Sequence, residues 1–416
     1  MKKILTFGAK FPLEPLDEEM RKKDVELALE FGNHKGASKN LDLLKELVGT
    51  DVKYGYGIVL PLDKITKIPK VWISPLNIAP QNTIDEFGRI VPKNRLTHDQ
   101  SWIYEGGSGT SVNSRVDKKQ LHPVRFGACV RRLVNWIVAA RRKYPNCPIP
   151  MSKTDFKSAF RRLHLCAEDA IQTVTQIPEE NLAIISTRLT FGGRPNPNLW
   201  NLFSESCTDL ANALQHDPDW NPLELYGPSQ QLVPPYEPLS PDLPFAPGKK
   251  LFVDVPVNPR GFADVYNDDI INLGVDLPGT DNVHRCDRVV LLAIAVMARA
   301  LSEDEPIPRE TMESLKKLKA ESKAEETKIV LGWLFDTRRL LISLPTNKAI
   351  AWKKEIDEML DLGKASAKQI ERNIGRFINV AQIIPEVNHF QNRLRCHQMK
   401  ASHRRNAVKF NQECIK

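Results

Sequence analysis

Apolar residues recur every three or four positions in several segments, which is the spacing of one face of an amphipathic helix. The clearest such segment begins at Phe126 and ends before Pro145, because proline cannot continue a helix. Between Asp287 and Leu301 the chain is apolar on nearly every side, which predicts a helix buried beneath a sheet. Further helices are predicted over 16–31, 41–48, 347–362 and 366–384, and 308–328 is expected to be a charged helical region.

Short apolar runs separated by Pro and Gly predict strands in the rest of the chain. Such runs occur between residues 54 and 99, and further strands are expected to begin at Met151 and Leu182. One hairpin is predicted to join 251–257 to 262–273, and a second to join 328–336 to 338–345. Nine prolines lie between 218 and 247, so 216–248 is expected to be an irregular surface insertion. This order of elements predicts an α+β fold with helical appendages.

The composition is that of a globular protein. Of the 416 residues, 41% are hydrophobic and 26% charged, which excludes wholesale disorder and collagen. The longest apolar run, Val289–Ala298, is well short of the ~20 residues that cross a bilayer. The N-terminus lacks the apolar core of a signal peptide. We therefore expect a soluble, intracellular protein with no membrane partner.

The net charge of +8 is concentrated near the C-terminus. Residues 364–416 contain eleven basic and three acidic side chains, so the rest of the chain is neutral overall. A basic segment suits the phosphate backbone of a nucleic acid, because neutralising phosphates releases condensed counterions. Ordinary solvated surface gives the same signal, so the charge alone does not identify a partner.

Two adjacent acids, Asp268 and Asp269, lie inside the apolar run VYNDDIINL. Desolvated carboxylates repel each other and are costly unless they are paired or bound to a metal. A hairpin tip with two carboxylates suits a divalent cation that prefers oxygen ligands. A third acid, Asp155, ends the strand that begins at Met151, and Phe160 follows five residues later. Each signal is weak alone. The acidic pair could be a solvent-exposed turn, and the phenylalanine could be an ordinary core residue.

The combination and order of six short blocks are more specific. They are KNRLTHD at 93–99, SVN at 111–113, DFKSAF at 155–160, LTFGGRPNPNLW at 189–200, YNDD at 266–269 and VLGW at 330–333. In this order they resemble the reverse transcriptases of retroelements, most of all the gypsy-like and DIRS-like type, over about residues 54–394.

The resemblance implies a right-hand polymerase with fingers, palm and thumb, in which helices back an antiparallel palm sheet. Residues 1–50 would then form a helical N-terminal extension, and 51–150 the fingers and the start of the palm. The palm would occupy 151–345, with the proline-rich insertion at 216–248. The thumb would follow at 346–385, and 386–416 would be the basic start of a connection segment.

The resemblance also implies an RNA-directed DNA polymerase activity, in which a primer 3′-hydroxyl attacks the α-phosphate of a dNTP with the help of two Mg²⁺ ions. Mn²⁺ is a possible substitute. Asp155 and Asp268 would bridge the two ions, and Asp269 would be a nearby, weaker ligand. The backbone carbonyl of Phe156 would also ligate. Two cations ~3.5–4 Å apart require a dense cluster of anionic oxygens, which accounts for acids in so apolar a context.

Further roles carry over to single positions. Arg95 matches the fingers arginine that clamps the triphosphate, with Lys93 assisting, and a guanidinium fork suits phosphate oxygens. Phe160 matches the aromatic residue that excludes a 2′-hydroxyl and so selects deoxynucleotides. Phe191 and Gly192 match the block that packs against the templating base pair, where glycine permits a close backbone approach. The primer-gripping hairpin is matched by Leu331, Gly332 and Trp333.

The implied partners are an RNA or DNA template with its primer and dNTPs, and the resemblance is compatible with a place in a larger retroelement polyprotein. One alternative is a catalytically decayed reverse-transcriptase-like protein that still binds nucleic acid. Asn267, Thr190 and Trp200 depart from the family pattern, although none of them removes an acid of the metal site. A viral RNA-dependent RNA polymerase is a third reading. Phe160 argues against it, because that class tends to place a polar or acidic residue there.

Overall fold

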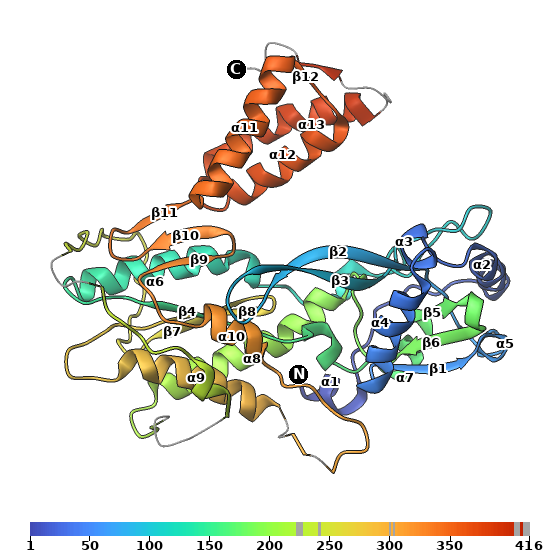
Figure 1. Cartoon of the computed structure of the whole chain (residues 1–416), viewed down its shortest axis with the longest axis horizontal. Coiled ribbons are helices and arrows are strands. Elements are labelled where there is room, and N and C mark those ends of the chain that lie inside the picture. The colour runs from blue at the N-terminus through green and yellow to red at the C-terminus, as the bar shows by residue number, and fades with distance from the viewer. Residues whose placement is uncertain (222–227, 240–242, 299–300, 303, 403–407, 411–416) are drawn as a thin grey trace. The chain divides into compact units, whose positions relative to one another are not determined.

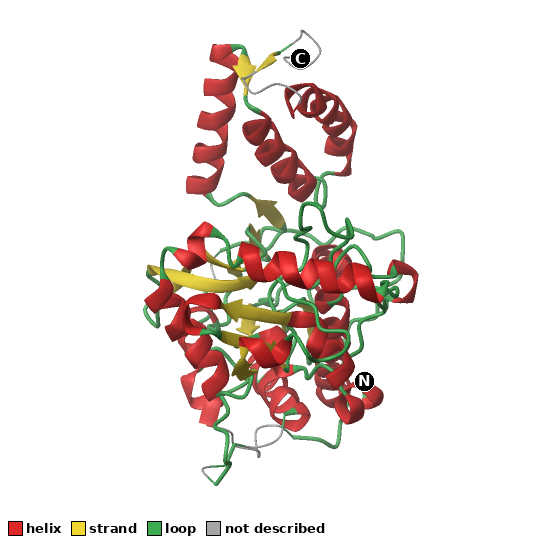
Figure 2. Cartoon of the chain, turned by 90° about the vertical axis from the view of Figure 1, so that its right-hand side faces the viewer, coloured by secondary structure: helices red, strands yellow, loops and turns green. Residues whose placement is uncertain are grey.

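The computed structural model describes residues 1–221, 228–239, 243–298, 301–302, 304–402 and 408–410 (Figure 1). The chain divides into two compact units, each built from three stretches of sequence. The first unit contains 1–127, 151–237 and 258–324, and the second contains 128–150, 238–257 and 325–416. Each unit combines helices with antiparallel sheets (Figure 2), so the chain is a mixed α/β protein.

The first unit begins with short helices, as the sequence predicts. They are α1 (Lys2–Phe7), α2 (Glu18–Phe31), α3 (Lys35–Ser38) and α4 (Leu41–Lys53). Helix α2 begins after Asp17, whose carboxylate accepts hydrogen bonds from two N–H groups of the first turn. It ends at Gly32, where φ is +70°.

Strands of the first unit form three antiparallel sheets. The first sheet has the order β1–β6–β5, made of β1 (Gly57–Pro61), β5 (Val174–Ile177) and β6 (Leu182–Ser186). The second is a hairpin of β2 (Leu76–Ile84) and β3 (Ile90–His98). The third has the order β4–β8–β7, made of β4 (Met151–Asp155), β7 (Phe262–Tyr266) and β8 (Asp269–Leu273). Short helices α5 (Leu62–Ile65) and α7 (Ala167–Ala170) lie between strands.

Two long helices pack on the β4–β8–β7 sheet. They are α8 (Asn196–His216) and α9 (Asn282–Met297), and their contacts reach β7 and β8 respectively. Trp200 and Phe203 from α8 share one buried core with Val265 and Ile270 from the sheet. The buried helix predicted after Asp287 is confirmed as far as Met297. The sheet that carries the acids is thus fixed by apolar contacts behind it.

The second unit contains α6 (Cys129–Lys143), which matches the predicted helix before Pro145. Its sheet has the order β11–β10–β9, made of β9 (Thr327–Val330), β10 (Trp333–Asp336) and β11 (Leu341–Ser343). The predicted helices that follow are α11 (Thr346–Leu362) and α12 (Ala367–Val380), and the latter has a capping box between Ser366 and Gln369. Helix α13 (Asn388–Ser402) and the short pair β12 (Lys364–Ala365) and β13 (Val408–Lys409) complete the unit.

Several sequence predictions are wrong in detail. Residues 251–257 form no strand, and the hairpin that carries the acids joins β7 to β8 instead. Pro256 supplies no amide hydrogen for pairing, and the Val257 carbonyl bonds to the Lys143 ammonium. Residues 328–345 form three strands rather than a two-stranded hairpin. Only α10 (Leu315–Glu321) is helical within 308–328.

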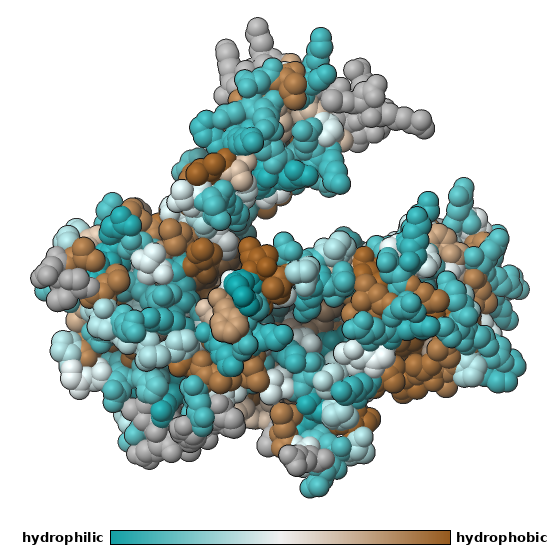
Figure 3. Space-filling model, viewed as in Figure 1, coloured by the Kyte–Doolittle hydropathy of each residue, from teal (hydrophilic) through white to brown (hydrophobic). Residues whose placement is uncertain are grey.

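In the proline-rich insertion, the described residues contain one 3₁₀ turn, Pro228–Leu232, while 222–227 and 240–242 lie outside the described residues. Hydrophilic side chains cover much of the face shown in Figure 3. Among the described helices, none is long and apolar enough to cross a membrane.

Candidate active site

The turn between β7 and β8 presents the acidic motif. Tyr266 pairs with Asp269, so Asn267 and Asp268 form a two-residue turn. Asn267 has φ +56°, a left-handed conformation that Asn tolerates better than most residues with a Cβ. Its carbonyl accepts a hydrogen bond from the Trp200 indole at 2.9 Å. The two unusual residues, Asn267 and Trp200, therefore both shape the tip of this hairpin.

Strand β4 brings Asp155 to the same place. Asp155 lies directly opposite Asp269 in the antiparallel register, so their side chains project from the same face of the sheet. One residue further, the Phe156 N–H donates to the Asp268 carbonyl at 3.1 Å. The three predicted acids, which come from two distant parts of the sequence, thus lie at the same end of this sheet.

Two lysines contact these carboxylates. The Lys317 ammonium on α10 lies 2.8 Å from Oδ1 of Asp155. The Lys153 ammonium on β4 lies 3.7 Å from Oδ1 of Asp269 and 3.0 Å from Oε2 of Glu321. Sequence reasoning assigned no role to Lys317, which is one of many charged residues in 308–328 and carries no local signal.

Burial dominates the electrostatics of the site. The Asp155 side chain is 9% exposed, and this burial raises its pKa to about 7, although the Lys317 ammonium opposes the shift. The negative charge of Asp269 raises the pKa of Asp155 further. Burial and the Asp269 charge also raise the pKa of Asp268. Such crowded, desolvated acids are typical of a cation site or a proton-transfer site.

The donor set fits Mg²⁺ when substrate oxygens are included. Asp155 and Asp268 line one cleft, and Oδ1 of Asp269 is buried without a hydrogen-bond partner. Within the described ranges, no three His, Cys, Asp or Glu side chains meet as a complete metal site. Mg²⁺ is commonly held by one or two carboxylates together with waters and substrate phosphates. Asp155 and Asp268 are therefore the side chains that could take part in holding such an ion.

The cleft has a volume of about 600 Å³ and also receives side chains from the β2–β3 hairpin. Lys93 and Arg95 line it, and burial, together with the positive charges of Arg95 and Lys317, lowers the pKa of Lys93. The Arg95 guanidinium lies 4.3 Å from the ring centre of Phe191. The Phe191 ring lies 5.4 Å from that of Phe160, which does not itself line the cleft. Arg95, Phe191 and Phe160 therefore form one row of contacts beside the acids.

Gly192 is required by a close backbone approach. Its φ is +138°, and a Cβ at this position would lie 1.8 Å from the His98 carbonyl oxygen. The His98 N–H donates to the Phe191 carbonyl at 2.8 Å, and the Asn113 amide donates to that of Gly192 at 2.7 Å. The glycine thus joins this block to the end of β3, while its role at a templating base pair stays a prediction.

The predicted primer-grip residues belong to the second unit. Leu331 and Gly332 connect β9 to β10 with φ values of +51° and +81°, the pattern of a type I′ turn. Trp333 is only 4% exposed, and its indole N–H lies 3.4 Å from the Asn379 side-chain oxygen. The Lys348 ammonium donates to the Gly332 carbonyl at 3.2 Å. Contact with a primer stays a prediction for these residues.

Glu310 is a cleft residue that sequence reasoning missed. Its carboxylate lies 2.7 Å from the Lys157 ammonium and accepts a hydrogen bond from the Tyr56 hydroxyl at 3.0 Å. The segment that follows bonds to the end of β4, since the Lys157 N–H donates to the Met312 carbonyl at 2.8 Å. The Ser314 N–H likewise donates to the Asp155 carbonyl at 2.9 Å. Because 308–328 was predicted as one helical region, nothing indicated that part of it lines the cleft.

The raised pKa of Asp155 has a consequence for stability. An unfolded Asp titrates near ~3.9 and Asp155 near 7, so the folded state binds this proton more tightly. The proton on Asp155 makes its full contribution to the free energy of unfolding below about pH 4, and this contribution is lost as the pH rises through 7. Between pH 5 and pH 8 the native chain should therefore lose on the order of 2 kcal/mol more stability than Asp155→Asn.

Urea unfolding in chelator at the two pH values measures this difference. Asp209→Asn, which changes an exposed acid on α8, should retain the native pH dependence. Equal pH dependence in Asp155→Asn and the native chain would mean that Asp155 has no raised pKa.

Comparison with known proteins gave matches among solved structures only, since no family model and no curated protein matches the chain. The chain is similar to a foamy viral protease-reverse transcriptase dRH in complex with double-stranded DNA, at 14% identity and a TM-score of 0.49. A foamy viral protease-reverse transcriptase in complex with RNA/DNA hybrid is similar at 14% identity and a TM-score of 0.45. A further one, in complex with double-stranded DNA, is similar at 14% identity and a TM-score of 0.41. These matches cover 98–99% of this chain but only 49%, 38% and 62% of those chains. The function proposed below therefore rests on the geometry of the site.

Proposed function

We propose that this chain is the RNA-directed DNA polymerase of a retroelement, which adds dNTPs to a primer 3′-hydroxyl on an RNA or DNA template. The observation that carries the proposal is the meeting of Asp155 from β4, Asp268 from the β7–β8 turn and Arg95 from β3 around one cleft. Paired carboxylates beside a guanidinium are the groups that phosphoryl transfer to a hydroxyl requires.

In this proposal, Asp155 and Asp268 hold two Mg²⁺ ions, with Asp269 as a weaker ligand, and Mn²⁺ is a possible substitute. The Phe156 carbonyl is a further proposed ligand. The ions would activate the 3′-hydroxyl and stabilise the charge on the leaving pyrophosphate. Lys317 must then release Asp155, which it contacts at 2.8 Å.

The remaining cleft residues bind and select the nucleotide in this proposal. Arg95 and Lys93 bind the triphosphate, since both line the cleft beside the acids. Phe160 supports Phe191 through their ring contact at 5.4 Å, and the pair limits the space at the sugar. We further propose a gypsy-like or DIRS-like element and a fingers, palm and thumb arrangement, in which Leu331, Gly332 and Trp333 grip the primer. A larger polyprotein context is part of the same proposal.

A catalytically decayed nucleic-acid-binding protein is the second candidate, and one contact favours it. The Lys317 ammonium neutralises Asp155, so the site as it stands already carries a cation of its own. In that case the chain would bind a primed template and yet bind no divalent ion.

Primer extension on an RNA template separates the two candidates. The polymerase proposal predicts extension of a DNA primer that depends on Mg²⁺ or Mn²⁺ and on added dNTPs. Salt-sensitive binding of the primed template, with no extension under either ion, would contradict it and favour the decayed protein.

A further inference from the structure

The end of the proline-rich insertion is anchored within the second unit. The ring of Phe245 contacts two guanidinium groups, and its centre lies 4.4 Å from that of Arg141 and 4.1 Å from that of Arg338. Arg338 also donates to the Leu243 carbonyl at 2.7 Å, and the Ala246 N–H donates to the Arg338 carbonyl at 2.9 Å. Residues 243–246 therefore have a fixed path despite their lack of regular structure.

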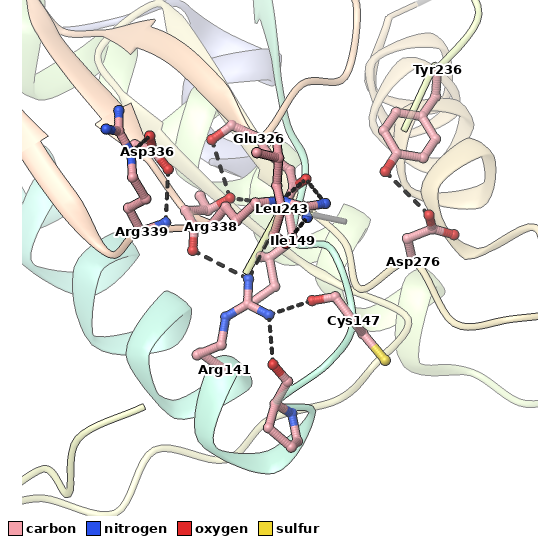
Figure 4. A network of polar contacts seen from close by, with 12 residues as sticks. Arg141, Cys147, Ile149, Tyr236, Leu243, Asp276, Glu326, Asp336, Arg338 and Arg339 are labelled. Atoms are coloured by element: carbon pink, nitrogen blue, oxygen red, sulfur yellow. Dashed lines mark hydrogen bonds and ion pairs between the residues drawn. The ribbon is translucent and has the colours of Figure 1, made fainter. Parts of the chain in front are cut away.

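A buried network holds these two arginines (Figure 4). Arg338 forms a salt bridge with Glu326 at 2.7 Å, and Arg141 lies 4.0 Å from the other oxygen of the same carboxylate. Arg141 is fully buried and also donates to the carbonyls of Cys147 at 2.6 Å and Thr337 at 3.2 Å. The Glu326 carboxylate and several backbone carbonyls thus hold in place the two arginine side chains that contact the insertion.

Beyond this anchor, residues 249–257 run beside the last turn of α6. A Cβ on Gly248 would lie 2.5 Å from the Arg142 backbone nitrogen, so only glycine permits this close approach. At the other end, the Lys143 ammonium donates to the Val257 carbonyl at 3.0 Å. We call the space between these contacts the α6 trough, lined by α6 residues 139, 142 and 143 and by residues 249–257.

The α6 trough is basic. Its volume is about 680 Å³, within the range of ligand pockets, ~300–1,000 Å³. Its lining carries four cations and one acid: Arg142, Lys143, Lys249 and Lys250 against Asp254. All four cations are exposed, and among the described residues no carboxylate forms a salt bridge with them. The trough therefore presents unneutralised positive charge to solvent.

An aromatic ring accompanies this charge. Phe252 is fully exposed, at 110% of its reference area, and Val253 next to it is 61% exposed. Both line the trough, which the four cations also line. Grooves that bind single strands combine these two features, because cations follow the phosphates while aromatic rings stack on unpaired bases.

We propose that the α6 trough binds single-stranded nucleic acid, at a site separate from the carboxylate cleft and independent of catalysis. Lys249, Lys250 and Arg142 contact the backbone, and Phe252 stacks on a base. A duplex offers no free base face to this ring, so a single strand is the better occupant. An acidic peptide would satisfy the lysines and would leave Phe252 without a role.

Ultraviolet cross-linking of the full chain to an oligothymidine of 20 nucleotides tests the site directly. We expect a cross-link at Phe252, found in the tryptic peptide 251–260, LFVDVPVNPR. Phe252→Ala should weaken binding of the oligonucleotide roughly tenfold, since stacking of a base contributes ~1–3 kcal/mol. It should leave binding of a duplex of equal length unchanged.

Salt dependence tests the lysines. Lys249→Ala/Lys250→Ala should reduce the slope of log affinity against log salt by about 1.4, which corresponds to two phosphate contacts on a single strand. Lys22→Ala/Lys23→Ala, an exposed lysine pair on α2, should leave the slope unchanged.

Two results would overturn this proposal. One is an unchanged slope together with cross-links only outside 251–260. The other is displacement of the oligonucleotide by polyglutamate with no effect of Phe252→Ala, which would indicate an acidic-peptide site. Neither result depends on polymerase activity, so this inference and the proposed function can fail separately.

Discussion

Asp268→Asn should reduce primer extension at least about 10²–10³-fold, while the protein stays folded. The substitution removes one anionic ligand from the cleft and keeps the shape of the side chain. It also keeps the turn, because the Asp268 carbonyl still accepts the Phe156 N–H and the Asn267 carbonyl still accepts the Trp200 indole. Single-turnover extension on an RNA template measures the loss.

Asp281→Asn provides the matched control, since it removes one exposed carboxylate at the start of α9, outside the cleft. It should extend primers at the native rate. Equal rates for Asp268→Asn and Asp281→Asn would exclude Asp268 from the reaction, and with it the carboxylate pair on which the proposed function depends.

Glu326→Ala should destabilise the second unit by about 3–5 kcal/mol, the usual cost of leaving buried charge without its partner. The Glu326 side chain is 1% exposed and is the carboxylate shared by Arg141 and Arg338, which are 0% and 4% exposed. Without it, two guanidinium groups stay buried with carbonyls as their acceptors. Hydrogen exchange of amides in α6 and β10 measures the loss locally, because the two units need not unfold together.

Glu358→Ala is the control within the same unit. The Glu358 side chain is 61% exposed and lies 3.9 Å from the ammonium of Lys354, which is 77% exposed, and such a surface pair contributes only ~0–1 kcal/mol. If Glu326→Ala and Glu358→Ala lowered the opening free energy of α6 by similar amounts, the buried network would not be what holds this unit together.

Local patterns predicted much of the fold because they report burial directly. The period of α6 and the apolar runs that contain Asp155 and Asp268 are signals of single elements, and the helix and the strands both appear in the structure. Residues 251–257 are equally apolar and yet form no strand. A segment becomes a strand only if it has backbone N–H groups to donate and a neighbouring strand to pair with. A single sequence shows where proline removes an N–H group, but it does not show which strand lies alongside.

The candidate site was predictable in part for a similar reason. Asp155, Asp268 and Arg95 belong to motifs in a recognisable order, and the structure brings them to one cleft. Lys317 and Glu310 contact the site from a segment with no motif. Their position follows from backbone bonds between 312–314 and the end of β4, which are long-range contacts without a sequence period.

Direct binding of Mn²⁺ tests the central claim, that Asp155 and Asp268 form a divalent-cation site. Free Mn²⁺ is counted by electron paramagnetic resonance during titration of the full chain with a 3′-deoxy primer on its template and a dNTP, so that no turnover occurs. The account predicts about two bound ions for the native chain and for Asp281→Asn, and loss of this binding in Asp155→Asn. Equal binding by Asp155→Asn and the native chain would contradict it.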